Sequence, residues 1–340
     1  MNRIITLGEI MLRLSPPGYE RILQTESFDV KFGGGEANVA VSLANYGESA
    51  AFVSAVPDNL LGQAAINSLR RYGVDTSLIL RSGKRLGIYY LEKGASQRPS
   101  KVVYDRAASS ISEVSADQFD WDNIFSGADW LHFTGITPAL SDSAAALCLE
   151  AVKQAKAKGL QVSCDLNYRK NLWSKEKAGQ VMETLMPYVD LCIANEEDAA
   201  DVFAIKAKHT DIQQGSLDKE GYIEVAKELI RRFGLKRVAI TLRESLSAST
   251  NNWSALLTDG KEFNFAKKYT IQIVDRVGGG DSFGAGLIYG LLNLDSDREA
   301  LEFATAASCL KHTIEGDYNL VSVSEVTALM KGDGSGRVQR

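Results

Sequence analysis

Short apolar runs recur along the chain, and helical stretches separate most of them. Strands that are nearly continuous in hydrophobic residues are buried on both faces, as in a parallel sheet covered by helices. Six runs have this character: 3–8, 50–56, 129–135, 160–166, 189–195 and 236–242. The segment between the third and fourth runs predicts a helix, with Ser141 or Asp142 as its N-cap and Gly159 at its end. The pattern therefore predicts an α/β fold with a mostly parallel sheet flanked by helices.

Two segments depart from this alternation. Residues 85–94 and 100–107 are rich in β-branched and aromatic residues, and a short polar stretch joins them in place of a helix. We expect an antiparallel hairpin outside the main sheet, and a small β-sheet lid formed by about 11–34 and 85–110. Strand edges on such a lid would gain from pairing with the lid of a second copy, which favours a homo-oligomer formed through the lid.

The length and composition of the chain limit the number of domains. With 340 residues, of which 45% are hydrophobic, the chain is long enough for one large domain and a small appendage. We assign residues 1–330 to the domain, including its lid, and expect a disordered tail over 331–340. The first residues lack the apolar core of a signal peptide, and no stretch approaches the ~18 apolar residues of a membrane span. We therefore expect a cytoplasmic protein without a membrane partner.

Charge and cysteine usage exclude several function classes. The balance of 38 basic and 43 acidic side chains gives a net charge of −5, which offers no field for nucleic acid or an anionic membrane. Any anionic ligand must then be held by a few local arginines. The four cysteines are scattered without a C-x-x-C pair, so neither a disulfide framework nor a zinc site is indicated.

Polar and charged residues follow the ends of four predicted strands. In open parallel sheets, ligands bind beyond the carboxyl ends of the strands. Any one of these side chains alone is equally well explained as a helix cap or a turn residue. Their repetition at one edge favours a ligand site, made of Thr134 and Gly135; Asp165, Asn167 and Arg169; Asn195, Glu196, Glu197 and Asp198; and Thr241 and Arg243.

The stretch "VGGGDSFGAG" places three glycines before an acid and an apolar helix. Gly278, Gly279 and Gly280 would expose backbone N–H groups, and a helix starting near Ser282 would direct its positive dipole end to the same space. This is an anion hole with Asp281 in the first helical turn. A base beside an anion site suits phosphoryl transfer, although a glycine-rich turn with an N-capping aspartate accounts equally well for the glycines alone.

A second glycine cluster, "GGGEANVAVSLANYG", begins at Gly33 and feeds another predicted helix. The small side chains from Ala37 to Ala44 form its apolar stripe and allow close packing. Asn38 lies off that stripe, where its amide would bind a polyol or hold the loop.

Taken together, these motifs resemble the ribokinase-like (pfkB) carbohydrate kinases. The resemblance covers almost the whole chain, since "GGGEANVAVSLANYG", "NEED" at 195–198 and "DRVGGGDSFGAG" at 275–286 occur in the family's order. It implies a ribokinase-like fold with a β-sheet lid, transfer of phosphate from ATP to a sugar hydroxyl, and Mg²⁺ bound with the nucleotide.

The resemblance also implies roles for individual residues. Asp281 matches the catalytic base, and the three glycines before it match the anion hole. The sugar-side loop corresponds to Gly33, Gly34, Gly35 and Asn38. Nucleotide contacts fall to Asn195, Thr241, Arg243 and Ser245, and the carboxylates of Glu197 or Asp198 would reach the metal through water.

The chain departs from the family pattern at several positions. Glu36 stands where many members have proline, and Arg276 where many have threonine. Pro57 and Asn59 replace a frequent glycine and acid. The Asn-x-x-Glu motif ends here in an aspartate, and the loop "RESLSAST" lacks the glycines often found after that strand.

Within the family the chain is most similar to the 2-keto-3-deoxygluconate kinases, in "GEIMLRLSPPG", "GIYYLEKG", "VVYDRAASS" and "DLNYRKNLWS". That similarity assigns Tyr89, Tyr104, Arg106 and Arg169 to the substrate, beside Asn167. A sugar acid also needs guanidinium groups for its carboxylate, whereas a neutral sugar does not. Taken without the resemblance, Arg106 reads as a solvated hairpin charge and Arg169 as a loop salt bridge.

We therefore expect an ATP-dependent kinase that phosphorylates 2-keto-3-deoxygluconate at its terminal primary hydroxyl. Two alternatives remain open from the residues. One is a kinase for a neutral sugar, of the fructokinase or ribokinase type. The other is a sugar- or nucleotide-binding regulator without catalysis. A dinucleotide-binding dehydrogenase is disfavoured, because no G-x-G-x-x-G follows the first strand.

Overall fold

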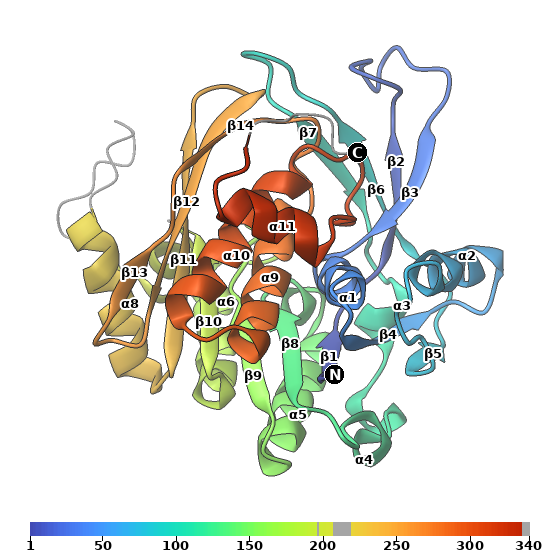
Figure 1. Ribbon diagram of the computed structural model, residues 1–340. Coiled ribbons are helices and arrows are strands. Elements are labelled where there is room, and N and C mark those ends of the chain that lie inside the picture. The colour runs from blue at the N-terminus through green and yellow to red at the C-terminus, as the bar shows by residue number, and fades with distance from the viewer. Residues whose placement is uncertain (196, 207–218, 335–340) are drawn as a thin grey trace.

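A large, mostly parallel sheet forms the centre of the molecule (Figure 1). The computed structural model describes residues 1–195, 197–206 and 219–334. Within them the sheet order is β13-β12-β11-β10-β9-β8-β1-β4-β5, and β14 pairs with β12. The strands from β11 to β5 in this order are parallel, and β12 runs antiparallel to β11. All six apolar runs form strands of this sheet, which confirms the predicted α/β class.

The strands of the main sheet have these bounds: β1 (Arg3–Leu7), β4 (Ser49–Val56), β5 (Ile79–Arg81), β8 (Trp130–Thr134), β9 (Gln161–Asp165), β10 (Leu191–Asn195), β11 (Arg237–Ser245), β12 (Thr250–Thr258), β13 (Phe263–Phe265) and β14 (Tyr269–Gln272).

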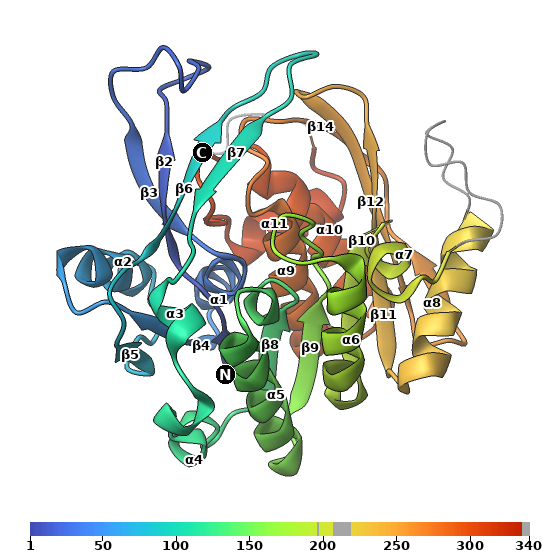
Figure 2. The same ribbon diagram turned by 180° about the vertical axis from the view of Figure 1, so that it is seen from behind.

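Helices cover both faces of the sheet. In Figure 1, α1 (Gly35–Asn45), α9 (Gly279–Asn293), α10 (Asp297–Lys311) and α11 (Val323–Met330) lie in front. The view from behind in Figure 2 shows α5, α6 and α8 on the other face. The remaining helices are α2 (Leu60–Arg70), α3 (Ser110–Glu113), α4 (Trp121–Ile124), α5 (Asp142–Ala157), α6 (Lys175–Leu185), α7 (Asp198–Phe203) and α8 (Lys219–Phe233), with 3₁₀ turns η1 (Ala116–Gln118), η2 (Thr137–Ala139) and η3 (Met186–Tyr188).

The core consists of two apolar layers, one on each side of the sheet. Successive residues of a strand point to opposite faces, so Ile5 joins one layer and Ile4 the other. Both side chains are fully buried, which explains why the strands read as continuous hydrophobic runs. Of the two predicted N-cap candidates of α5, Ser141 is the N-cap and Asp142 is the first helical residue, and Gly159 follows the helix with a φ of +80°.

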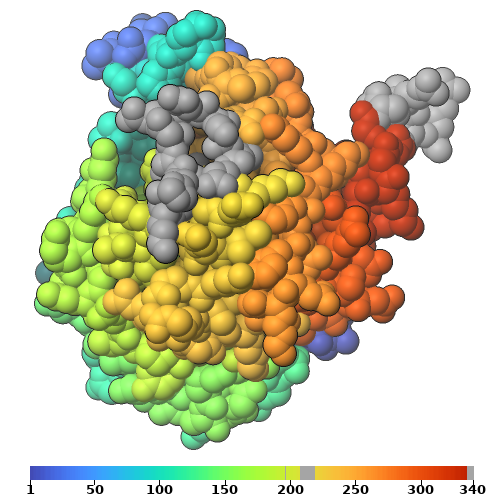
Figure 3. All heavy atoms as spheres, turned by 90° about the vertical axis from the view of Figure 1, so that its left-hand side faces the viewer, coloured from blue at the N-terminus to red at the C-terminus, as the bar shows by residue number. Residues whose placement is uncertain are grey.

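A separate sheet of four strands, here called the lid, stands at the carboxyl-end edge of the main sheet. Its order is β3-β2-β6-β7, from β2 (Met11–Ser15), β3 (Asp29–Gly33), β6 (Gly87–Glu92) and β7 (Lys101–Asp105). The hairpin of β6 and β7 is antiparallel, as predicted. Its tip reaches the loop after β11, where Ala248 N donates to Ser96 O at 2.7 Å. In Figure 3 the cyan hairpin meets the orange β11–β12 region above the body of the molecule.

Residues 331–334 follow α11 without regular structure, and 335–340 lie outside the described residues. Across the part of the chain that is described, no helix has the length and apolar character needed to cross a bilayer.

Hydrogen bonds to Glu36 hold the start of α1 against the last residue of β8 and the first residue of η2. Its Oε1 accepts hydrogen bonds from Thr134 N at 3.0 Å, Thr134 Oγ1 at 2.8 Å and Thr137 Oγ1 at 2.7 Å. Burial raises the pKa of Glu36 to about 7, although these three hydrogen bonds favour the carboxylate. Glu36 is thus a buried acid that holds the start of α1 against the sheet.

The raised pKa of Glu36 predicts a pH-dependent stability. Between about pH 4.5, where the unfolded glutamate titrates, and about pH 7, the folded chain holds a proton that the unfolded chain has lost. This contribution is therefore full below the unfolded pKa and is lost as pH rises through 7. Chemical denaturation at pH 5 and pH 8 should show a smaller drop in unfolding free energy for Glu36→Gln than for wild type. An equal drop in both proteins, or the same change in the exposed control Glu262→Gln, would contradict this assignment.

Candidate active site

The glycine turn before α9 has the geometry of an anion hole. Gly278 adopts a φ of +81° and is the N-cap of α9, which begins at Gly279, earlier than the predicted start near Ser282. A Cβ on Gly278 would collide with the backbone oxygen of Asp317, so glycine is needed there. The N–H groups of a first helical turn have no intrahelical acceptor, and the helix dipole adds positive potential at this end.

Asp281 lies in that first turn and is held by Asn38 from α1. Asn38 Nδ2 donates to Asp281 Oδ2 at 2.7 Å, and Asn38 Oδ1 accepts from Gly34 N at 3.3 Å. Burial raises the pKa of Asp281 to about 6, even though the Asn38 hydrogen bond lowers it. A carboxylate of this pKa is ionised at neutral pH and still basic enough to accept a hydroxyl proton. The two glycine motifs thus meet through a contact between residues far apart in sequence.

A cavity of about 890 Å³ opens at this edge of the main sheet, beneath the lid. Most predicted site residues line it, from the lid, the glycine turns and the strand ends. Those in the lining are Gly34, Gly35, Asn38, Tyr89, Tyr104, Arg106, Asn167, Arg169, Asn195, Glu197, Asp198, Thr241, Arg243, Gly278, Gly280 and Asp281. Gly33, Gly279 and Ser245 do not line it. Gly33 gives room to the Asp317 carboxylate and Gly279 to the His312 ring.

On the lid side, Arg106 is buried rather than solvated. Only 8% of its side chain is exposed, and its Nε donates to Glu9 Oε2 at 2.8 Å, with a second bond from Nη2 to the same oxygen. The guanidinium lies 5.4 Å from the ring centre of Tyr104, and the hydroxyl of Tyr89 donates to Asp317. The alternative interpretation of Arg106 as a solvent-facing hairpin charge is therefore wrong.

Asn167 and Arg169 come from the loop after β9. Asn167 has a φ of +40°, a left-handed conformation that asparagine tolerates. Arg169 is exposed, and its Nη1 donates to the carbonyl of Tyr168 at 3.2 Å. Its positive charge favours the ionised form of Asp165 and Asp281. It is therefore an exposed cation in the lining of the cavity, in contrast with the buried Arg106.

The polar residues after β10 build a helix start. Asn195 Oδ1 accepts from the N–H groups of Glu197 at 2.8 Å and Asp198 at 3.0 Å. Asp198 is itself buried, with its two oxygens accepting from Tyr168 N and Asn195 N at 3.1 Å each. Glu196, the other acid of this motif, lies outside the described residues. Asn195 and Asp198 thus stabilise the turn that leads into α7, whose N-cap is Glu197, whatever further ligand they bind.

Of the residues predicted to contact the nucleotide, some line the cavity and one does not. Thr241 Oγ1 donates to Ala194 O at 3.4 Å, and Arg243 lies in the cavity lining. Ser245 ends β11 outside that lining. Trp253 and His312, which the sequence interpretation did not name, also line the cavity, as does Arg276, which it named only as a departure from the family pattern. Among the described residues, no group of three or more His, Cys, Asp or Glu side chains has the arrangement of a metal cage.

Sequence reasoning missed several acids of the cavity. Glu9 and Asp317 line it beside the predicted residues, and Asp165 was named only as one of many strand-end residues. Glu9 follows β1 in the strand-end position that marked the other candidates, so the same rule identifies it. Asp317 lies in the loop after α10, where no strand-end rule applies.

Comparison with known proteins decides the family. The model of the pfkB family carbohydrate kinases matches residues 1–322. The chain belongs to the pfkB family of carbohydrate kinases. A 2-dehydro-3-deoxygalactonokinase of Haloferax volcanii is 32% identical over 98% of both chains.

Two solved structures extend this comparison. The crystal structure of 2-dehydro-3-deoxygluconokinase from Thermotoga maritima is 52% identical, with a TM-score of 0.94 over 98% of this chain and 100% of that one. A structure from E. coli, provisionally assigned as ribokinase II and solved with ATP and Mg²⁺, is 20% identical with a TM-score of 0.80 over 97% and 99% of the two chains. This second likeness concerns the fold alone.

The position of Asp281 predicts the effect of removing its charge. Asp281→Asn should lower kcat by about 10²–10⁴-fold, because an amide does not accept the hydroxyl proton. Its circular dichroism spectrum and melting temperature should stay near those of wild type. Steady-state kinetics with ATP and an acceptor sugar measure this loss. The first-turn aspartate of α5 provides a matched control, since Asp142→Asn should keep wild-type turnover. More than a tenth of wild-type kcat in Asp281→Asn would refute the base assignment.

The Asn38 contact predicts where the acid limb of activity lies. Wild-type kcat/KM should fall below about pH 6, as Asp281 becomes protonated. Asn38→Leu removes a hydrogen bond that favours the carboxylate, so the limb should move to higher pH and activity should recover in alkaline buffer. The measurement is kcat/KM as a function of pH. The control is Asn67→Leu, the same change at an exposed asparagine of α2. A lower rate with an unmoved limb would show that Asn38 does not set the pKa of Asp281.

Proposed function

We propose that this carbohydrate kinase transfers the γ-phosphoryl group of ATP to 2-keto-3-deoxygluconate, at its terminal primary hydroxyl. The observation that carries the proposal is the pair Arg106 and Arg169 in the same cavity as the base Asp281. A neutral sugar has no use for these guanidinium groups, whereas a sugar acid has a carboxylate that they bind by charge-assisted hydrogen bonds. The relatives from Thermotoga maritima and Haloferax volcanii, both named as kinases of 2-dehydro-3-deoxy sugar acids, support this substrate class.

Glu9 prepares Arg106 for this role. A guanidinium has five N–H donors, and Glu9 takes two of them, from Nε and Nη2. The Nη1 side is then held in a fixed orientation for a substrate carboxylate. Arg106, Arg169 and Glu9 together carry one net positive charge, which the single negative charge of a sugar acid balances.

The acceptor hydroxyl would face Asp281 while the carboxylate lies between the two arginines. Asp281 would take the hydroxyl proton as the phosphoryl group arrives at the N-terminus of α9. Tyr89 and Tyr104 would form the wall of the sugar site. The lid, by closing over the cavity, would exclude water that otherwise competes as acceptor.

ATP and Mg²⁺ are the cofactors we propose. Thr241 and Arg243 would lie beside the nucleotide, and Asn195 would do so from the start of α7. Both oxygens of Asp198 already accept backbone N–H groups, so the carboxylate suits a water-mediated contact with the metal. Bound to the nucleotide, Mg²⁺ would neutralise phosphate charge. Glu197 and Asp198 would orient its water ligands.

The substrate proposal is tested by exchanging one group of the acceptor. 3-Deoxyfructose has a hydroxymethyl group in place of the carboxylate of 2-keto-3-deoxygluconate, so the pair isolates the charge. Arg106→Ala should lower kcat/KM for the acid. The loss should correspond to roughly 2–5 kcal/mol of transition-state stabilisation, as for truncated buried charge pairs. The loss in Arg169→Ala should be smaller, because water screens an exposed arginine. Both variants should barely change activity on 3-deoxyfructose.

A matched control comes from the same lid. Arg85 pairs with Asp105 outside the cavity, so Arg85→Ala should leave both activities unchanged. Equal losses on acid and neutral acceptors, or a wild-type preference for fructose or ribose, would instead favour the neutral-sugar alternative. The galactonate epimer belongs in the same panel, since one relative is named for it.

A further inference from the structure

Lys311, at the end of α10, is a fully buried lysine that the proposed reaction does not use. Its relative exposure is 0%, and the structure gives its ammonium one hydrogen bond among the described residues, from Nζ to Ile314 O at 3.2 Å. Burying an ammonium group costs free energy unless opposite charges compensate. A lysine in this position therefore needs an explanation from its surroundings.

Two segments that form the floor of the anion hole enclose this lysine. Asp275, shortly before the glycine turn, accepts from Val277 N at 3.1 Å and from Gly316 N at 3.0 Å. Val274 N donates to His312 O at 2.8 Å, which joins the same two segments again. The joined segments are thus the one before α9 and the one after α10.

The lysine stem lies close to the first glycine of the anion hole. A Cβ built on Gly278 would lie 3.2 Å from Lys311 Cε. The ammonium is also near enough to Asp281 in the first turn of α9 to attract its carboxylate. Its charge adds to the potential of the helix N-terminus on the same side.

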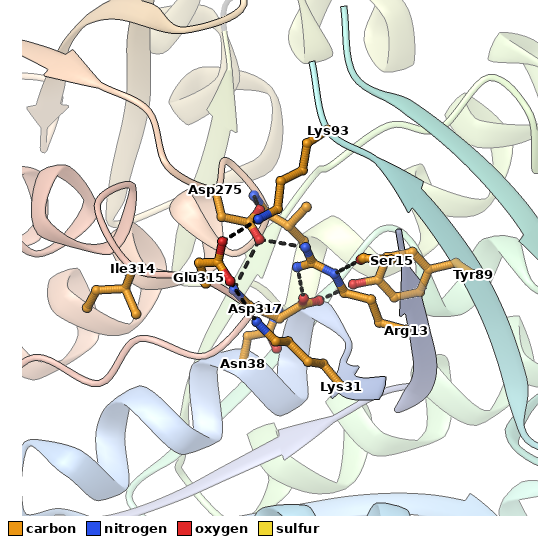
Figure 4. Close-up of polar contacts among 12 residues, drawn as sticks. Arg13, Ser15, Lys31, Asn38, Tyr89, Lys93, Asp275, Ile314, Glu315 and Asp317 are labelled. Atoms are coloured by element: carbon orange, nitrogen blue, oxygen red, sulfur yellow. Dashed lines mark hydrogen bonds and ion pairs between the residues drawn. The ribbon is translucent and has the colours of Figure 1, made fainter. Parts of the chain in front are cut away.

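Charges of both signs surround Lys311. Arg13 from β2 donates from Nη2 to Asp275 Oδ2 at 2.5 Å and from Nη1 to Asp317 Oδ1 at 2.6 Å, and Figure 4 shows these ion pairs. Both aspartates and Asp281 attract Lys311, and Arg13 repels it. Removal of Lys311 would therefore leave these three aspartates with one fewer cation beside them.

We propose that Lys311 is a positioning residue, whose buried positive charge holds the turn at Gly278 in shape and strengthens the anion hole for the transferred phosphoryl group. The proposal rests on the proposed kinase activity but not on the identity of the acceptor. Any acceptor that wild type phosphorylates serves for the test, so a wrong substrate assignment and a wrong role for Lys311 give different results.

The protonation of Lys311 supplies a readout that a purely structural role would not move. Burial lowers the pKa of Lys311 to about 8, against the attraction of Asp275 and Asp317. The other groups that face it titrate elsewhere: burial lowers the pKa of His312 to about 4 and raises that of Asp281 to about 6.

The remaining titratable neighbours are Asp275, Asp317 and Tyr89. Burial alone would raise the pKa of Asp275, but Arg13 and Lys311 hold it below the usual range. Burial raises the pKa of Asp317 against the attraction of Arg13, and burial also raises the pKa of Tyr89 well above its ordinary value. Wild-type kcat should therefore fall through one step near pH 8 as the ammonium loses its proton.

Lys311→Met removes the charge and keeps the length of the side chain. Its kcat should be about 10–100-fold lower at pH 7, a loss comparable to or smaller than that of an oxyanion-hole donor. KM for both substrates should be unchanged, and the step near pH 8 should be absent. Lys331→Met, the same change at an exposed lysine after α11, should behave as wild type.

Lys311→Arg is the second variant, because a guanidinium stays charged throughout this pH range. It should keep more of the wild-type kcat than Lys311→Met and lack the alkaline step. A wild-type kcat that is constant from pH 7 to about 9.5 would overturn the proposal, even if neither variant folds. So would an unaltered alkaline step in either variant, or a Lys311→Met kcat equal to that of wild type.

Discussion

The buried ion pairs of Arg13 are the interaction on which the arrangement of the lid depends. Arg13 belongs to the lid strand β2, yet its guanidinium bonds to Asp275 before α9 and to Asp317 after α10. Removing one partner of such a buried pair typically costs about 3–5 kcal/mol, because the remaining charge is left without water or a counter-ion. These ion pairs therefore favour one position of the lid on the domain. The hydrogen bond from Tyr89 to Asp317 favours the same position.

Asp281 differs from its neighbours in its partners. Asp275 and Asp317 are both ion-paired with Arg13, whereas among the described residues the side-chain hydrogen bond to Asp281 comes from the neutral amide of Asn38. Burial raises the pKa of Asp281 to about 6, and the Asn38 hydrogen bond offsets this rise only in part. A catalytic base needs this partial stabilisation, since a carboxylate held by a full ion pair would be too weak a base. The acids that join the lid to the domain are thus distinct from Asp281, the proposed base.

The fold was largely predictable because its signals are local. A few neighbouring residues determine the conformation of each of these features: the continuous apolar runs, the hairpin between 85 and 107, and the glycine turn before α9. The ion pairs were not predictable, since Arg13 and Asp317 are 304 positions apart, and Glu9 and Arg106 are 97 apart. No periodicity relates such positions. The start of α9 at Gly279 was also missed, because glycine is a poor helix former and only the surrounding segments impose the helix there.

The same long-range pairing bears on how acceptor specificity arises. Arg106 alone would be a flexible cation on a lid strand, able to bind any anion that entered. Glu9 fixes its Nε side, so the guanidinium presents one edge in one direction, and a carboxylate must arrive with matching geometry. Within the part of the chain that the structure describes, Arg169 has no such carboxylate partner and lies at the exposed rim, where it adds charge with little geometric demand. Discrimination between sugar acids should therefore depend on the lid side of the cavity, while attraction of anions in general depends on the rim.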